Sequence, residues 1–134
     1  MPVTMICMPD EPLVIAEFHG RMDLESVRIM FQESARFAQM LNRRVYRIVD
    51  YLDAEASFRD MATALAEGKK GGPGSPRDPR IREVMVAGRN RIRFLLDILR
   101  RKEYGSIEVP VYDTMDEALA SVHAQLLEPY EMRV

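Results

Sequence analysis

The sequence has little cysteine and little histidine: Cys7 is the one thiol, and His19 and His123 are the two imidazoles. A single cysteine excludes a disulfide within the chain, and the apolar strand pattern around Cys7 predicts a buried structural thiol. The histidines are isolated from each other and from Cys7, so no spacing typical of metal ligands is present. We therefore predict no catalytic residue, no metal and no cofactor from a linear motif.

Long apolar runs and nucleotide-binding motifs are missing as well. The uncharged apolar stretches are far shorter than the roughly 20 residues that span a bilayer, and residues 1–4 lack the basic start of a signal peptide. The P-loop, the Rossmann glycine pattern and the G-x-S-x-G elbow of a Ser-His-Asp triad are all absent. These absences favour a cytoplasmic protein without a transmembrane segment.

What the chain does contain is typical of one globular domain. Its 134 residues, 47% hydrophobic and 30% charged, suit a single domain over residues 1–134. The net charge of −2 hides an asymmetry, because residues 68–102 hold eleven basic and three acidic side chains. Such a split indicates either an anionic ligand or surfaces that pair within or between subunits, and the second is the simpler interpretation. The acidic total and the lack of a recognised motif argue against nucleic acid.

Hydrophobic periodicity predicts an α/β fold. Strands are expected at residues 3–8, 13–18, 45–52, 81–87 and 108–112, and helices at 23–41, from Ser57 to Gly68, from Asn90 to Gly105 and from Thr114 to Pro129. The order is ββαβαβαβα, which predicts a mostly parallel sheet of about five strands with an N-terminal hairpin and four helices. Four glycines and three prolines in residues 68–80 predict an exposed, mobile loop.

Polar residues follow the predicted parallel strands, at the edge of the sheet where ligands usually bind. Asp50, Asp53 and Asp113 form a possible acidic site, which would suit Mg²⁺ or a phosphoryl group. The alternative is that these carboxylates cap helices and pair with nearby arginines.

The start of the third helix is a second candidate. The candidate residues are Gly88, Arg89, Asn90 and Arg91, with Arg93 following. The arginines would add positive charge to a helix end whose free N–H groups already favour anions. This predicts a phosphate or carboxylate site, unless Asp50, Asp53 or Asp113 supplies the negative charge.

The first helix offers a different kind of surface. Met30, Phe37 and Met40 could extend its apolar face beyond one stripe. A wider face of this kind would suit a homodimer interface or a lipid-binding groove.

The element order, with the closing segment 109–120 (Val-Pro-Val-Tyr-Asp-Thr-Met-Asp-Glu-Ala-Leu-Ala), resembles the SpoIIAA-like superfamily of STAS and STAS/SEC14-type domains. The resemblance implies a small regulatory domain, without catalysis, that engages a protein partner, a second copy of itself or a small ligand. Anti-sigma-antagonist members carry a phosphorylatable serine in an Asp-x-Ser-Gly segment after the middle strand. Residues 50–57 lack the Ser-Gly pair, so that switch is not carried over. The alternatives are a metal-assisted enzyme or phosphoacceptor and an apolar-ligand binder.

Overall fold

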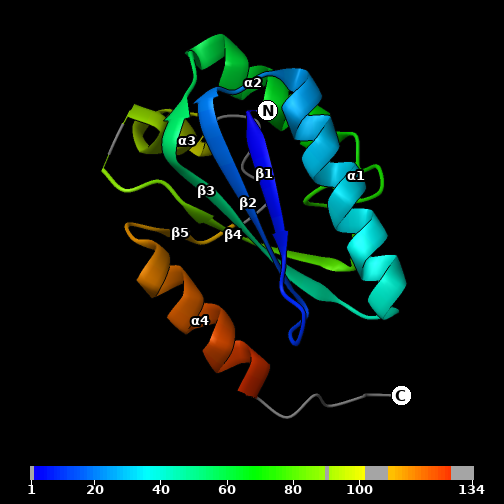
Figure 1. Ribbon diagram of the computed structural model, residues 1–134. Helices are drawn as coiled ribbons and strands as arrows, with labels where there is room; N and C mark the ends of the chain where they lie inside the picture. Colours follow the sequence, from blue (N-terminus) through cyan, green and yellow to red (C-terminus); the bar gives the residue numbers. More distant parts are fainter. Residues whose placement is uncertain (1, 90, 102–108, 128–134) are drawn as a thin grey trace.

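The computed structural model describes residues 2–89, 91–101 and 109–127, which form one mixed sheet with helices on both faces (Figure 1). The strands are β1 (Val3–Cys7), β2 (Leu13–Arg21), β3 (Val45–Glu55), β4 (Ile81–Val86) and β5 (Val111–Tyr112), adjacent in that order. β1 is antiparallel to β2, and every other neighbouring pair is parallel. The helices are α1 (Leu24–Leu41), α2 (Phe58–Lys69), α3 (Arg91–Arg101) and α4 (Met115–Leu127). The predicted fold class and element order are confirmed.

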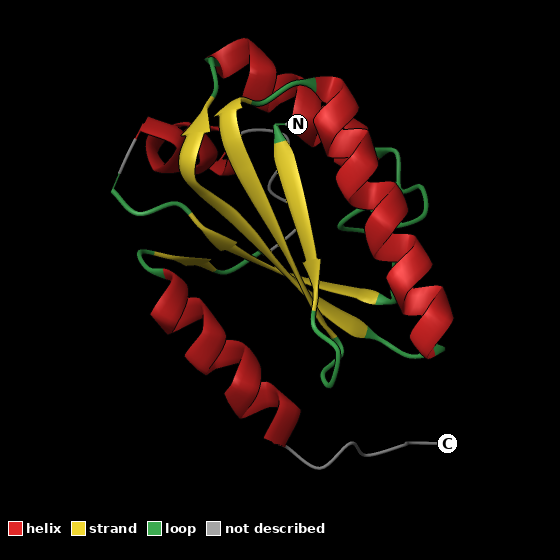
Figure 2. Ribbon diagram, viewed as in Figure 1, coloured by secondary structure: helices red, strands yellow, loops and turns green. Residues whose placement is uncertain are grey.

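The sheet separates two apolar layers. Figure 2 shows α4 on one side of the sheet, away from the other three helices. Alternation along β3 explains this arrangement, because Ile48 packs with α4 residues such as Val122, whereas Val49 packs with α1, α2 and α3. No helix among the described residues is long and apolar enough to cross a membrane.

Helix ends follow the sequence signals closely. Asp23 and Ser26 form a reciprocal capping box at the start of α1, and Ser57 and Asp60 form another at the start of α2. Asn42 ends α1 in the left-handed conformation, with φ of 51°. The predicted boundaries at Asn90, Gly105 and Pro129 lie outside the described residues.

Two strands are longer than predicted. β2 and β3 each continue three residues beyond positions 18 and 52, and these extra residues pair with one another after a bulge between Glu17 and His19. Gly20 and Asp53 are poor strand formers, so a prediction from local propensity ends both strands too early. Pairing with the neighbouring strand overrides that propensity.

Cys7 is exposed, so the predicted burial of this thiol is wrong. β1 is an edge strand, and Cys7 lies at its end, near Glu33 and Arg36 of α1. Partial burial and the Glu33 carboxylate raise the pKa of the thiol. The apolar pattern gave the correct strand but not its place at the rim of the sheet.

The exposed apolar surface of α1 is also smaller than predicted. Met30 and Phe37 are 4% and 8% exposed and belong to the core, whereas Met40 is 71% exposed. Met40 alone of the three therefore reaches the surface. A homodimer remains a prediction.

Candidate binding site

The loop between β4 and α3 holds the residues predicted to bind an anion. Gly88 has φ of 59°, and a Cβ there would lie 3.2 Å from a Leu52 methyl carbon and 3.5 Å from the Asp113 carbonyl oxygen. The left-handed turn therefore favours glycine at position 88, and a side chain there would also press on the Leu52 methyl group.

The acid that faces this loop is Asp113. Arg93 Nη1 donates to Asp113 Oδ1 at 2.8 Å, and Arg89 Nε lies 3.9 Å from Oδ2. This pairing agrees with the second of the two interpretations given above, in which an aspartate of the chain supplies the negative charge for the arginines. Anion binding by Gly88, Arg89 and Arg91 stays a prediction, and Asn90 lies outside the described residues.

The possible acidic site is divided between separate roles. Asp50 Oδ1 accepts the backbone N–H of Leu52 at 2.9 Å, and Asp53 is exposed in the ladder opposite His19. Asp113 is bound to Arg93, as described above. Among the described residues, no three or more Asp, Glu, His or Cys side chains are placed to hold a metal ion. The three aspartates therefore do not form one metal-binding group.

A groove of about 500 Å³ lies at the same edge of the sheet. Its lining residues are Arg21, Leu52, Ala54, Glu55, Ala56, Ser57, Asp60, Arg91 and Ile92. Arg21 pairs with Asp60 across 3.5 Å, and the backbone N–H of Ser57 holds the pKa of Asp60 below its usual value. The walls thus combine fixed polar groups with apolar side chains.

Three large apolar side chains are exposed on this groove or close in sequence to residues that line it. Leu52, Phe58 and Phe94 are 43%, 45% and 64% exposed. Phe58 follows Ser57 of the groove wall, and Phe94 lies one helical turn from Arg91. We call these three residues, with the groove, the carboxyl-edge surface.

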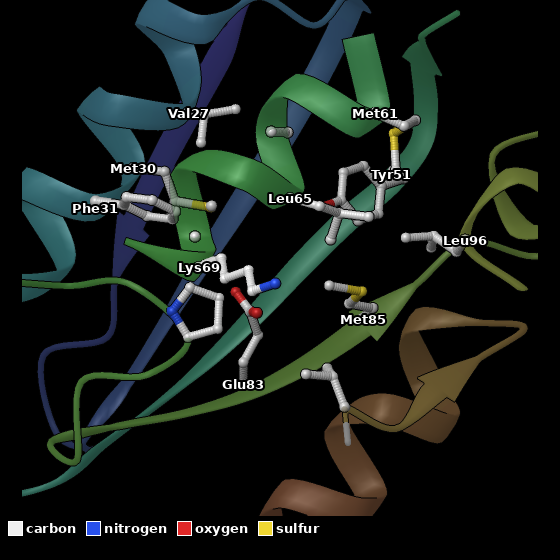
Figure 3. Close-up of a pocket in the computed structure, with 14 residues that line it drawn as sticks. Val27, Met30, Phe31, Tyr51, Met61, Leu65, Lys69, Glu83, Met85 and Leu96 are labelled. Atoms are coloured by element: carbon white, nitrogen blue, oxygen red, sulfur yellow. The ribbon is translucent and has the colours of Figure 1, made fainter. Parts of the chain in front are cut away.

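A second, apolar pocket of about 60 Å³ lies between the sheet and helices α1, α2 and α3 (Figure 3). Its lining residues are Val27, Met30, Phe31, Tyr51, Met61, Ala64, Leu65, Gly68, Lys69, Pro76, Glu83, Met85, Leu96 and Val109. Figure 3 shows the ends of Lys69 and Glu83 pointing toward one another in this pocket. Burial raises the pKa of Tyr51 far above its usual value, so its phenol stays neutral.

Beside that pocket lies a buried ion pair that the sequence analysis missed. Arg47 Nε donates to Glu83 Oε1 at 2.8 Å, and the two side chains are 0% and 3% exposed. Arg47 Nη2 lies 2.6 Å from the same oxygen as an ion pair, but neither Nη2 nor Glu83 Oε2 has a hydrogen-bond partner among the described residues. The Arg47 guanidinium also lies 5.4 Å from the centre of the Phe31 ring.

A sequence signal for this pair exists in the strand alternation. Arg47 lies on the same face of β3 as Val45 and Val49, the face that α1, α2 and α3 cover. The strand register places Arg47 opposite Glu83 of β4. Two opposite charges at inward positions of neighbouring strands indicate a buried pair.

The same arginine fixes the loop of residues 68–80. Arg47 Nη1 donates to the Gly74 carbonyl oxygen, and Gly74, Ser75 and Asp78 are buried. Gly68 is buried as well, so the predicted exposure of the loop is wrong at four residues. At Gly74 the reason is that a buried guanidinium needs backbone oxygen as a partner. Mobility of the loop stays a prediction. The hydrogen bond from Arg47 restricts the movement of the loop at Gly74.

Asp78 closes the loop and makes its stability depend on pH. Its carboxylate accepts hydrogen bonds from the Arg80 side chain at 2.8 Å and from the Gly74 N–H at 2.7 Å. The Arg80 side chain is the first cause that lowers the pKa of Asp78 well below its usual range. A carboxyl group whose pKa is lower in the folded state stabilises the fold above its unfolded pKa of about 3.9. That stabilisation is lost as the pH falls toward the folded value.

We expect the free energy of unfolding of the Asp78→Asn variant at pH 7 to be about 2 kcal/mol lower than that of the wild type. The difference from the wild type should shrink as the pH falls below about 4, because the Asp78 carboxyl group then binds a proton in the unfolded wild-type chain before it does so in the folded protein. Urea denaturation at a series of pH values from 7 to 2 measures this. A difference that stays constant across the series would contradict the assignment.

Comparison with solved structures supports the fold. The chain superposes on an uncharacterised DUF3478-family protein with a SpoIIAA-like fold from Shewanella loihica, with a TM-score of 0.55 and 12% identity over 89% of this chain and 90% of that one. It superposes equally well, with a TM-score of 0.55, on the anti-sigma factor antagonist SpoIIAA in its unphosphorylated form, at 12% identity over 90% and 97% of the two chains. An anti-sigma factor antagonist from Mycobacterium paratuberculosis gives 18% identity and a TM-score of 0.49, over 90% and 94%.

These likenesses define the class of fold: the chain has a SpoIIAA-like, STAS-type α/β fold, as its sequence predicts. No protein-family model and no curated protein matches the sequence. At these identities the likeness carries the architecture and not the activity.

Proposed function

We propose that the protein is a non-catalytic regulatory domain that binds a protein partner through the carboxyl-edge surface. The observation that carries the proposal is the exposure of Leu52, which lines the groove, and of Phe58 and Phe94, which lie close in sequence to residues that line it. Large apolar side chains grouped at the surface are typical of interaction sites, and aromatic residues often dominate their binding energy. Each of the three comes from a different element, so the fold itself assembles the surface.

The charges around the surface indicate the chemistry of the partner. Arg21 and Arg89 have side chains that are 79% and 91% exposed, although they pair with Asp60 and Asp113, and Arg91 lines the groove. A partner with an acidic rim around an apolar centre would complement them. SpoIIAA, which shares the fold, is by its description an antagonist of an anti-sigma factor. That description supports a regulatory role in which one protein acts on another.

The alternatives predicted from the sequence are weaker on physical grounds. A metal-assisted enzyme or phosphoacceptor needs carboxylates that face one another, whereas Asp50 accepts a backbone N–H and Asp113 accepts from Arg93. An apolar-ligand binder would use the pocket below α1 and α2, which measures about 60 Å³. Benzene occupies an engineered protein cavity of about 150 Å³, so a lipid chain would need a much larger space. A cytoplasmic location belongs to the proposal as an expectation.

The test compares charged substitutions on and off the surface. We expect Phe94→Asp and Phe58→Asp to weaken partner binding about tenfold or more, because a buried apolar contact is replaced by an unpaired charge. Met40→Asp is the matched control, since Met40 is 71% exposed on α1 and lies outside the surface. Affinity capture followed by quantitative mass spectrometry identifies the partner, and titration of that partner gives the affinities of the wild type and the three variants.

The outcomes separate the possible occupants. A protein retained by the wild type and by Met40→Asp, but lost with both phenylalanine variants, supports the proposal. Sedimentation that shows a wild-type dimer and a Phe94→Asp monomer would make the partner a second copy. Equal capture by all four proteins would refute the carboxyl-edge surface as the binding site.

A further inference from the structure

A second groove lies at the opposite edge of the sheet, where β3, β4 and β5 begin. It has a volume of about 480 Å³, within the range of sites for small molecules. Its lining residues are Arg44, Pro76, Arg77, Asp78, Pro79, Ile81, Arg82, Glu83, Val84, Val109, Pro110 and Gln125. We call it the amino-edge groove.

The acids of this groove are already committed to other arginines. Asp78 is paired with Arg80 at 2.8 Å, and Glu83 is paired with the buried Arg47 at 2.6 Å. Both carboxylates are almost fully buried, with 5% and 3% of their side chains exposed. Among the described residues of the wall, no carboxylate is therefore left to balance Arg44 and Arg82.

Two of its arginines lie in or directly before neighbouring strands. Arg82 lies in β4 opposite Tyr46 of β3, Arg44 directly precedes β3, and both arginines line the groove. Both are exposed, and neither has an ion pair with any residue that the structure describes. Two like charges on one groove repel each other, and an anion bound between them would relieve that repulsion.

We propose that the amino-edge groove binds a small molecule that carries at least two phosphate or carboxylate groups. Arg44 and Arg82 each present a planar fork of N–H donors, which matches either group with paired hydrogen bonds. Arg77 also lines the groove but has an interaction of its own, so Arg44 and Arg82 carry the site. The groove lies at the opposite edge from the carboxyl-edge surface, so this site does not depend on the proposed protein partner.

The test is a titration with two small anions at constant ionic strength. Inorganic pyrophosphate and citrate are added to ¹⁵N-labelled protein, and the backbone N–H signals of residues 44 and 82 report binding. We expect Arg44→Gln and Arg82→Gln each to weaken the bound anion about tenfold, because each removes one charge-assisted fork. Arg82→Lys keeps the charge but loses the fork, so it should fall between Arg82→Gln and the wild type.

Arg43→Gln is the matched control, because Arg43 is an exposed neighbour of Arg44 that does not line the groove. Its affinity should remain within about twofold of the wild type, since only a screened long-range charge is lost. Tighter binding of pyrophosphate identifies phosphate groups as the natural ligand chemistry, and tighter binding of citrate identifies carboxylates.

Three results would overturn the proposal. One is the same affinity in the wild type, Arg44→Gln and Arg82→Gln. Another is an equal loss in Arg43→Gln, which would mean a general effect of net charge. The third is no binding of either anion while an oligonucleotide or a glutamate-rich peptide shifts the same signals. Circular dichroism checks that each surface variant is folded.

Discussion

The Arg47→Met variant should lose about 3–5 kcal/mol of the free energy of unfolding. The substitution leaves Glu83, whose side chain is 3% exposed, as a buried carboxylate without its counterion. It also removes the donor to the Gly74 carbonyl oxygen and the cation that lies over the Phe31 ring. Urea denaturation, monitored by circular dichroism at pH 7, measures the loss.

Two further variants separate the ion pair from the mere loss of an arginine. Arg28→Met removes an exposed pair with Glu67, in which Arg28 is 51% exposed, and should leave the urea midpoint almost unchanged. The double variant Arg47→Met, Glu83→Met replaces both charges with apolar side chains and should regain much of the stability lost by Arg47→Met alone. A double variant less stable than Arg47→Met would contradict this explanation, because it would mean that the Glu83 carboxylate is not destabilising without Arg47.

The element order was predictable because each helix and strand carries its own local signal. Ser57 and Asp60 mark the start of α2 within four residues, and Asn42 marks the end of α1. β4 shows how burial is encoded as well, since Val84, Met85 and Val86 are buried on alternate faces between two helix layers. Signals of this kind depend on neighbours in sequence, and the fold preserves them.

Features that depend on distant residues were not predictable in the same way. Arg47 and Glu83 are 36 positions apart, and a charged residue in a strand reads as solvent-facing until its partner strand is known. The buried part of the 68–80 loop follows from that pair, because Gly74 is held by Arg47 and not by any pattern of its own. The carboxyl edge was partly predictable: Asp113 does face the arginines, but Asp50 and Asp53 have other roles.

Gly74→Ala is the second substitution with a large expected effect. Gly74 has φ of 77°, and a Cβ there would lie 1.8 Å from the carbonyl oxygen of Phe31 in α1. The left-handed conformation costs an alanine about 1–2 kcal/mol, and relief of the overlap requires the loop to move away from α1. We expect a total loss of about 3 kcal/mol, measured by urea denaturation. Hydrogen exchange should also become faster in residues 68–80.

Gly72→Ala is the matched control in the same loop, because nothing lies within 4 Å of a Cβ at Gly72. Its stability should remain within about 0.5 kcal/mol of the wild type.

The Gly74 contact is also shared with Arg47, so the two large effects are not independent. In the double variant Gly74→Ala, Arg47→Met the combined loss should be smaller than the sum of the single losses, because both remove the hydrogen bond to the Gly74 carbonyl oxygen. Simple additivity would mean that Arg47 stabilises the sheet without holding the loop, and the loop of residues 68–80 would then be as free as its glycines and prolines predict.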